Sequence, residues 1–312
     1  MLETRFKVAI LLAVLFMTVL PVIGILKGTK PPPPEVATRV PHDGELQDSL
    51  ADQTSAHIDP IPEKMIRIPA GPFIRGTGAG GYDERPEHTA SLEAYWIDRH
   101  EVTNHHYQEF RAATGHRYAG PPSRYAKNMA RLRGMNQPIV YVSWEDAAAY
   151  CRWKGKRLPT EAEWEKAMRG TDGRLWPWGN ELDLTAANWG NQDGYPVAAP
   201  VGTFQRDVSP FGVVDGAGNV MEWVADWYEE RAYHLPHPRN PAGPEHGVYR
   251  VMRGGVYTTR GKDLRITSRS KMVPTFRDET IGFRCAKSAN GRGGQTASSV
   301  AGNSQEIKVV ED

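Results

Sequence analysis

Cys151 and Cys285 are the two cysteines of this 312-residue chain, and they set the limits of its thiol chemistry. A cysteine pair can bind a soft metal ion, exchange disulfides or form one structural bridge. An even cysteine count is also compatible with two buried free thiols. If the two cysteines are bridged to each other, no thiol remains for catalysis.

Carboxylates and histidines gather at two other places in the chain. The three glutamates between Glu161 and Glu165 alternate, a spacing that sends successive helix side chains to different faces. We interpret them as helix-dipole residues, with Glu163 as a capping residue, and not as a paired general acid and base. Of ten histidines, the densest group is His100, His105 and His106. Because neighbours on a helix point to different sides, we interpret this group as solvated surface histidines.

Three helices and several short strands must position these residues. Helices are predicted near 103–113, 143–154 and 160–169, each opened by a Ser or Thr N-cap. Strand-like runs lie at 65–68, 95–98 and 248–252. With 31 Gly and 24 Pro, much of the remaining chain should be irregular. The expected fold class is α+β with little regular secondary structure.

The charge balance excludes one broad class of function. The chain carries 38 basic and 37 acidic side chains, so its net charge of +1 gives no general field that would attract nucleic acid. We therefore predict no nucleic-acid partner.

The chain divides into four parts. Residues 1–30 contain an uncharged apolar run, Val8 to Leu26, that is long enough to span a bilayer and predicts an N-terminal membrane anchor. A cleaved signal peptide is the alternative, although no small-residue cleavage site follows the run. Residues 31–63 are Pro-rich and polar, which indicates a tether. Residues 64–287 are expected to form one domain, and residues 288–312 a disordered tail.

Several long motifs follow one another through residues 64–287. They are Ile68-Pro69-Ala70-Gly71-Pro72-Phe73, Glu101-Val102-Thr103-Asn104, the stretches 142–151 and 155–165, Trp176-Pro177-Trp178-Gly179-Asn180, Gly218-Asn219-Val220-Met221-Glu222-Trp223, Arg253-Gly254-Gly255 and Ile281-Gly282-Phe283-Arg284-Cys285. Their types and order resemble the formylglycine-generating enzyme, or sulfatase-modifying factor, family. The resemblance implies a C-type-lectin-like α+β fold. It also implies a Cys151–Cys285 disulfide, since family members with cysteines at these two places join them.

The resemblance also locates a missing metal site. Formylglycine-generating enzymes bind copper through two further cysteines that follow Arg-Gly-Gly. In this chain those positions hold Thr259 and Leu264, and neither side chain can bind Cu(I). Val256 and Met221 are further departures from the family pattern in the same pocket. We therefore predict no copper and assign no catalytic residue.

Two structural calcium sites are implied by the same resemblance, because the family builds them from oxygen ligands, which Ca²⁺ prefers. The first would use the side chains of Asn188 and Asp193 with the backbone carbonyls of Trp189 and Tyr195. The second would use the side chains of Asp215 and Glu222 with the carbonyls of Gly218 and Val220. The alternative is an ordinary turn at 193–194 and a solvated loop acid at Asp215.

Around the copper position, the family has a groove that receives an extended peptide. Its candidate residues here are Tyr257, Thr259, Arg260, Asp263, Arg265 and Arg269. Arg and Tyr are frequent anchors in such grooves. The alternative is a solvated charged loop.

Two functions remain. The first is a single-pass protein of the inner (cytoplasmic) membrane, whose domain lies in the periplasm or outside and acts as a binding or maturation factor. Its partner would be a secreted or membrane protein or peptide client. The second is an oxidoreductase of the same fold with another cofactor, either of nonheme-metal type or like a periplasmic pyoverdine-maturation branch of the family that also lacks the paired cysteines. We favour the first, because Thr259, Leu264 and Val256 provide no redox group or soft ligand.

Overall fold

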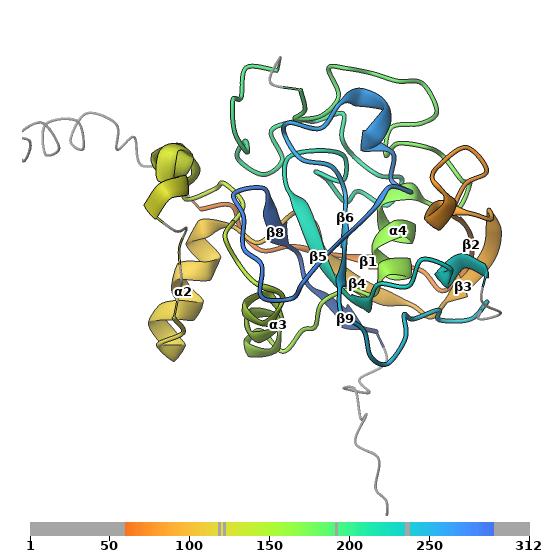
Figure 1. The fold of residues 1–312 in the computed structure, drawn as a ribbon, viewed down its shortest axis with the longest axis horizontal. Coiled ribbons are helices and arrows are strands. Elements are labelled where there is room, and N and C mark those ends of the chain that lie inside the picture. The colour runs from red at the N-terminus through yellow and green to blue at the C-terminus, as the bar shows by residue number, and fades with distance from the viewer. Residues whose placement is uncertain (1–59, 118–119, 121–122, 191–192, 235–237, 290–312) are drawn as a thin grey trace, which may run out of the picture. The chain divides into compact units, whose positions relative to one another are not determined.

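The computed structural model describes residues 60–117, 120, 123–190, 193–234 and 238–289. Within these residues the chain forms nine strands, three α-helices and four 3-10 helices, joined by long irregular segments (Figure 1). The mixed α+β class predicted from the sequence is therefore confirmed. The predicted anchor, most of the tether and most of the tail lie outside the described residues. No helix in the described part of the chain is long and apolar enough to cross a membrane.

Three sheets provide the frame. In the first, β1 (Met65–Ile68), β4 (Tyr95–Asp98) and β9 (Ala286–Ser288) pair antiparallel in the order β1-β4-β9. The second is a hairpin of β2 (Gly71–Arg75) and β3 (His88–Leu92). The third contains β7 (Arg269–Met272), β6 (Arg250–Arg253), β5 (Met221–Trp227) and β8 (Ile281–Phe283) in the order β7-β6-β5-β8. In this sheet β5 and β8 run parallel, so segments far apart in sequence meet.

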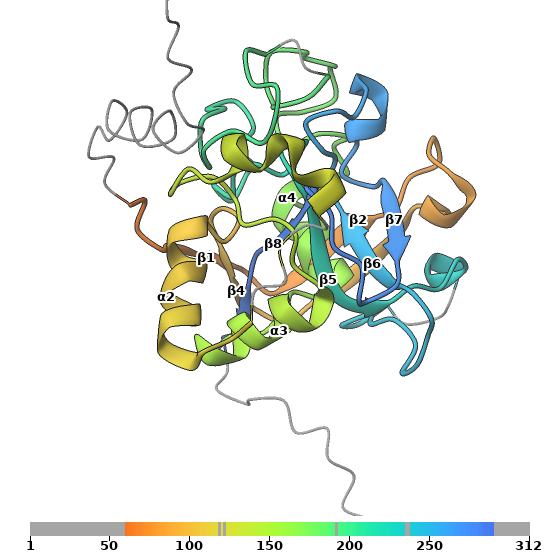
Figure 2. The same cartoon turned by 60° about the vertical axis from the view of Figure 1, so that its left-hand side comes forward.

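The three α-helices begin where the capping signals predict. They are α2 (Asn104–Thr114), α3 (Trp144–Trp153) and α4 (Glu161–Arg169). The side chains of Thr103, Ser143 and Thr160 each accept a hydrogen bond from the backbone N–H three residues later, which satisfies a donor that the helix leaves unpaired. At α4 the Glu163 carboxylate completes a capping box. Helices α2 and α3 lie side by side in both views (Figure 2).

Two elements differ from the sequence prediction. The predicted strand at 248–252 is displaced to 250–253, because its antiparallel ladder with β5 begins at the pair Arg250 and Trp227. A ten-residue 3-10 helix, η2 (Ser123–Leu132), was not predicted. The remaining 3-10 helices are η1 (Tyr82–Glu84), η3 (Ala232–His234) and η4 (Gly261–Leu264).

Helix α4 lies at the centre of the packing. It contacts β2, β5 and β6, and all nine of its residues are buried. Trp164 of α4 and Trp223 of β5 are fully buried in two adjoining regions of the hydrophobic core. Because α4 has no solvent-facing side, its charged residues must find partners inside the domain.

Candidate functional site

Cys151 and Cys285 form the predicted disulfide. Cys151 lies in α3 and Cys285 follows β8, their Cα atoms are 5.6 Å apart, and both side chains are fully buried. The backbone N–H of Cys285 also donates to Asp98 Oδ2 of β4, at 2.9 Å. The bridge thus links α3 covalently to the residue between β8 and β9. The chain retains no free thiol.

Thr259 lies two residues before η4 and Leu264 is the last residue of η4, and both side chains lie beside Gly255. A Cβ atom at Gly255 would overlap Leu264 Cδ2 and lie 3.4 Å from Thr259 Cβ, so the two side chains flank the same point. The Thr259 hydroxyl accepts a hydrogen bond from the Val256 N–H at 2.9 Å. Leu264 is buried in the hydrophobic core. This place therefore holds a hydroxyl and an aliphatic side chain, and neither is a ligand for a soft metal ion.

The candidate groove residues do not all face solvent. Tyr257 is buried and donates to Glu279 Oε1 at 3.2 Å, while Arg260 and Asp263 are exposed. Arg265 is ion-paired with Glu84, at 3.0 Å. Neither of the two described cavities is lined by these residues.

Arg269 corrects the predicted groove, because its side chain is fully buried. Its Nε and Nη2 atoms donate to the two carboxylate oxygens of Glu161 at 2.7 and 3.0 Å. Its Nη1 atom donates to the backbone carbonyls of Asp83 and Glu229. All of its nitrogen atoms are bound within the domain, so Arg269 stabilises the fold and is not free to bind a client.

Glu161 and Glu165 are the centre of a buried charge network. Glu161 also pairs with Arg75 and Arg253 at 3.4 and 3.3 Å. Glu165 accepts from Arg253 at 2.8 Å and from Arg169 at 3.2 Å. The sequence interpretation of these glutamates as helix-dipole residues missed this network, since the arginines come from distant segments. The one local signal was the glutamate-rich helix itself.

The network holds the Glu161 carboxylate in its charged form. Burial alone would raise the pKa of Glu161, but the charges of Arg269, Arg253 and Arg75 lower it to about 2. Asp226, which accepts from the Glu161 N–H at 2.7 Å, behaves in the opposite way. Burial and the nearby Glu161 charge raise the pKa of Asp226 to about 6.

The first predicted calcium set contains one buried side-chain oxygen without a hydrogen-bond partner. The Asp193 carboxylate accepts from the backbone N–H groups of Trp189 and Tyr195 at 2.6 and 2.8 Å, which brings those residues together. Asn188 Nδ2 donates to Val197 O and to Asn219 Oδ1, both at 3.1 Å. Asn188 Oδ1 is buried and has no hydrogen-bond partner in the described structure. A buried oxygen left in this state is a suitable Ca²⁺ ligand, so the set fits, and calcium stays a prediction here.

The second set fits less well, because Glu222 already has a cationic partner. Its carboxylate accepts from Arg284 Nε and Nη2, both at 2.7 Å, and from Trp164 Nε1 at 3.0 Å. Asp215 Oδ2 accepts from the Gly202 N–H at 2.6 Å. Burial raises the pKa of Asp215 to about 6, so this carboxylate, unlike that of Glu222, would gain from a bound cation.

A strained turn joins the two calcium sets. Asp215, Gly218 and Asn219 have φ values of +56°, +94° and +55°. A Cβ at Gly218 would overlap the Asn188 carbonyl oxygen, so glycine is required by both its conformation and its packing. The Asn219 N–H donates to that carbonyl at 3.0 Å, and Val220 beside it is buried. The backbone of Asn188 in the first set therefore contacts the turn at Gly218 and Asn219 in the second.

The histidine interpretation was partly wrong. His100 and His106 are buried rather than solvated, and burial lowers the pKa of His100 to about 4. Their ring Nδ1 atoms lie 3.0 Å from Glu101 O and Thr103 Oγ1, respectively. Across the residues with described positions, no three His, Cys, Asp or Glu side chains converge in a metal-binding group. Each predicted calcium set uses only one or two carboxylates together with backbone carbonyls, so it is not a group of this kind.

Comparison with known proteins covers the same part of the chain as the motifs. The model of the sulfatase-modifying factor enzyme 1-like domain matches residues 52–289. The chain belongs to this family. The family resemblance stated from the motifs is thereby confirmed.

Its relatives within the family differ in length and name. The formylglycine-generating enzyme of Streptomyces coelicolor is 34% identical and covers 75% of this chain and 92% of its own length. The inactive Cα-formylglycine-generating enzyme 2 of Mus musculus is 30% identical, with coverages of 72% and 86%. The serine/threonine-protein kinase pkn1 of Chlamydia caviae is 36% identical over 73% of this chain, but this chain spans only 38% of that kinase. Among solved structures, PvdO from Pseudomonas aeruginosa is 28% identical with a TM-score of 0.64, covering 74% of this chain and 99% of that one.

Proposed function

We propose that this protein is a membrane-anchored, extracytoplasmic member of the sulfatase-modifying factor family that lacks the copper–thiolate site. It would act as a binding or maturation factor for a secreted or membrane protein. The observation that carries the proposal is the fate of the cysteines, since both are used in the Cys151–Cys285 bridge. Thiolate ligands for Cu(I) are therefore missing from the whole chain.

The compartment is supported by the same bridge. Disulfides form and persist in oxidising surroundings, such as the periplasm or the cell exterior. The apolar run at 8–26 would then supply the single membrane span, with the domain on the non-cytoplasmic side. A client would meet the domain in that space.

The client would bind near η4, where exposed Arg260 and Asp263 flank the Thr259 and Leu264 positions. An exposed arginine can bind a client carboxylate with two parallel hydrogen bonds. Leu264 is buried in the hydrophobic core beside this surface, which favours client binding over a chemical reaction at this place. One family relative, the mouse protein named as inactive, is consistent with a family fold that persists without the enzyme activity.

Calcium would stabilise this domain at up to two sites. The first ion would be held by the side chains of Asn188 and Asp193 with the carbonyls of Trp189 and Tyr195. The support for this site is that Asn188 Oδ1 is buried and has no hydrogen-bond partner among the described residues. The second ion would lie at Asp215 and would have to share Glu222 with Arg284. Each bound ion would raise the stability of the folded state by mass action.

An oxidoreductase using another cofactor is the competing function. Its support is the likeness to relatives named formylglycine-generating enzymes over most of the domain. The two proposals differ in what the purified, full-length protein binds. Metal analysis that finds calcium and no stoichiometric copper or iron supports a binding factor, whereas stoichiometric copper or iron supports the enzyme.

A gain-of-site variant tests the missing copper site directly. Because Thr259 and Leu264 flank the same point beside Gly255, the double variant T259C/L264C should bind one Cu(I) ion, and the native protein none. The single variants T259C and L264C are matched controls, since one thiolate binds Cu(I) more weakly. Tight Cu(I) binding by the native chain at this place would refute the proposal. The same preparations should be tested for oxidation of a cysteine-containing peptide, which the native protein should leave unchanged.

A further inference from the structure

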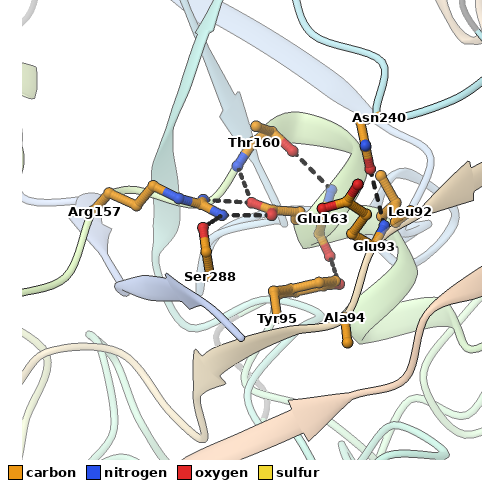
Figure 3. Close-up of a pocket in the computed structure, with 9 residues that line it drawn as sticks. All are labelled: Leu92, Glu93, Ala94, Tyr95, Arg157, Thr160, Glu163, Asn240 and Ser288. Carbon is orange, nitrogen blue, oxygen red and sulfur yellow. Dashed lines mark hydrogen bonds and ion pairs between the residues drawn. The ribbon is translucent and has the colours of Figure 1, made fainter. Parts of the chain in front are cut away.

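A cavity lies apart from the η4 region. Its volume is about 710 Å³, and it opens between the β3–β4 link, the approach to α4 and the end of β9 (Figure 3). It shares no lining residue with the candidate groove or the calcium sets. A cavity of this size can enclose a small peptide or a drug-sized molecule.

One wall is a neutralised ion pair. Arg157 Nη1 and Nη2 donate to the two carboxylate oxygens of Glu163 at 2.6 and 2.7 Å, and the Thr160 N–H donates to one of them at 2.8 Å. Arg157 Nη2 also donates to Ser288 Oγ at 3.3 Å. The Glu163 side chain is 10% exposed, while the guanidinium-bearing side chain of Arg157 is 39% exposed. Arg157 Nη1 also donates to Leu158 O at 3.2 Å, so both Nη groups are bound within the domain and this wall carries no surplus charge.

The opposite wall carries a surplus negative charge. The Glu93 carboxylate points toward the Arg157–Glu163 pair (Figure 3). Its one ionic contact within the described residues is a 3.5 Å approach from Arg239, whose side chain is 78% exposed. Such an exposed contact binds Glu93 only weakly. Glu93 is thus the charge in this cavity that remains available to a ligand.

Asn240 fixes this wall and adds a donor. Its Oδ1 atom accepts from the Glu93 N–H at 2.9 Å, and its own N–H donates to Ser91 O at 2.8 Å. Its φ of +43° is a conformation that Asn adopts more readily than most residues. The Asn240 Nδ2 group makes no hydrogen bond to any described residue, so it can donate to an oxygen atom in the cavity.

We propose that this cavity binds an α-ammonium group that neighbours a carbonyl or carboxylate, as in an amino acid or the N-terminus of a peptide. Glu93 accepts from the ammonium group, while Asn240 Nδ2 donates to the oxygen. The ligand's positive charge matches the surplus charge of the wall. This site is independent of the proposed client-binding function, and either can fail without the other.

Calorimetric titration of the full-length protein with three probes tests the site. Trialanine and free L-alanine carry the α-ammonium group, and N-acetyl-trialanine lacks it. Trialanine should saturate the site below about 10 mM, the weak end of specific binding, and N-acetyl-trialanine should not bind. Tighter binding of trialanine than of L-alanine identifies a peptide N-terminus as the ligand, and the reverse order identifies a free amino acid.

A matched pair of variants assigns the binding to Glu93. E93Q should weaken binding of the preferred probe about tenfold, because it removes one charge-assisted hydrogen bond at an exposed position. E87Q removes an exposed acid outside the cavity and should leave binding unchanged. The inference is overturned if neither ammonium probe binds, if N-acetyl-trialanine binds as tightly as trialanine, or if E93Q binds like the native protein.

Discussion

Loss of the Cys151–Cys285 bridge should remove a large share of the stability of this domain. The bridge closes a loop of 134 residues. In the chain-entropy model, a cross-link of that span lowers the entropy of the unfolded chain by about 17 cal/mol/K, or about 5 kcal/mol at 25 °C. Domains typically unfold with a total free energy of about 5–15 kcal/mol. Reduction should therefore bring the domain close to its unfolding threshold.

Urea denaturation of three samples separates the cross-link from the packing of its sulfur atoms. Oxidised and reduced native protein differ only in the bond, while C151A/C285A also lacks both buried sulfurs. Because the bridge is fully buried, the native protein must be reduced in denaturant and refolded. Thiol titration must then count two thiols in the reduced protein and none in the oxidised protein. If the reduced and oxidised proteins had equal urea midpoints, the loop-entropy reasoning would be refuted.

Three further predictions concern charges and calcium. E161Q removes the charge that balances three buried arginines and should cost about 3–5 kcal/mol in urea unfolding, whereas exposed E230Q should cost almost nothing; equal costs would contradict the network. The pKa of Asp226 is raised to about 6, so the folded state binds its proton more tightly than the unfolded state does. The stability that this proton contributes is present below about pH 4 and is lost as the pH rises through 6. Relative to D226N, native protein should lose about 2 kcal/mol of stability between pH 4 and 7, and a constant difference would contradict this. Calcium at about 100 times its Kd should add about 2.7 kcal/mol, which EGTA reverses and D193N diminishes; a melting temperature indifferent to EGTA would argue against the site.

Local signals explain why so much of the fold could be predicted. The N-caps Thr103, Ser143 and Thr160 act within one helical turn, so the sequence alone places the helix starts. Strands β1 and β4 match their predicted bounds because each is a short run of apolar and aromatic residues. The start of β6 could not be placed, since it depends on where β5 offers a partner.

The site was harder to predict because its partners are distant in sequence. Glu161 pairs with Arg269, which is 108 residues away in sequence. No pattern within α4 indicates which arginines will pair with its glutamates. The same holds for Glu222 and Arg284, which are 62 residues apart. A groove predicted from one stretch of chain therefore included Arg269, whose position is decided by another stretch.

Leu264 packs the end of η4 into the hydrophobic core. Its side chain is 1% exposed. Burial of a leucine contributes about 1.5–3 kcal/mol, so this position stabilises the domain by packing. The disulfide and the Glu161 network do not include η4 side chains, and they hold the strands and α4 independently of it. Under the proposed client-binding function, the surface around Arg260 and Asp263 could therefore change its client without disturbing the disulfide or the Glu161 network.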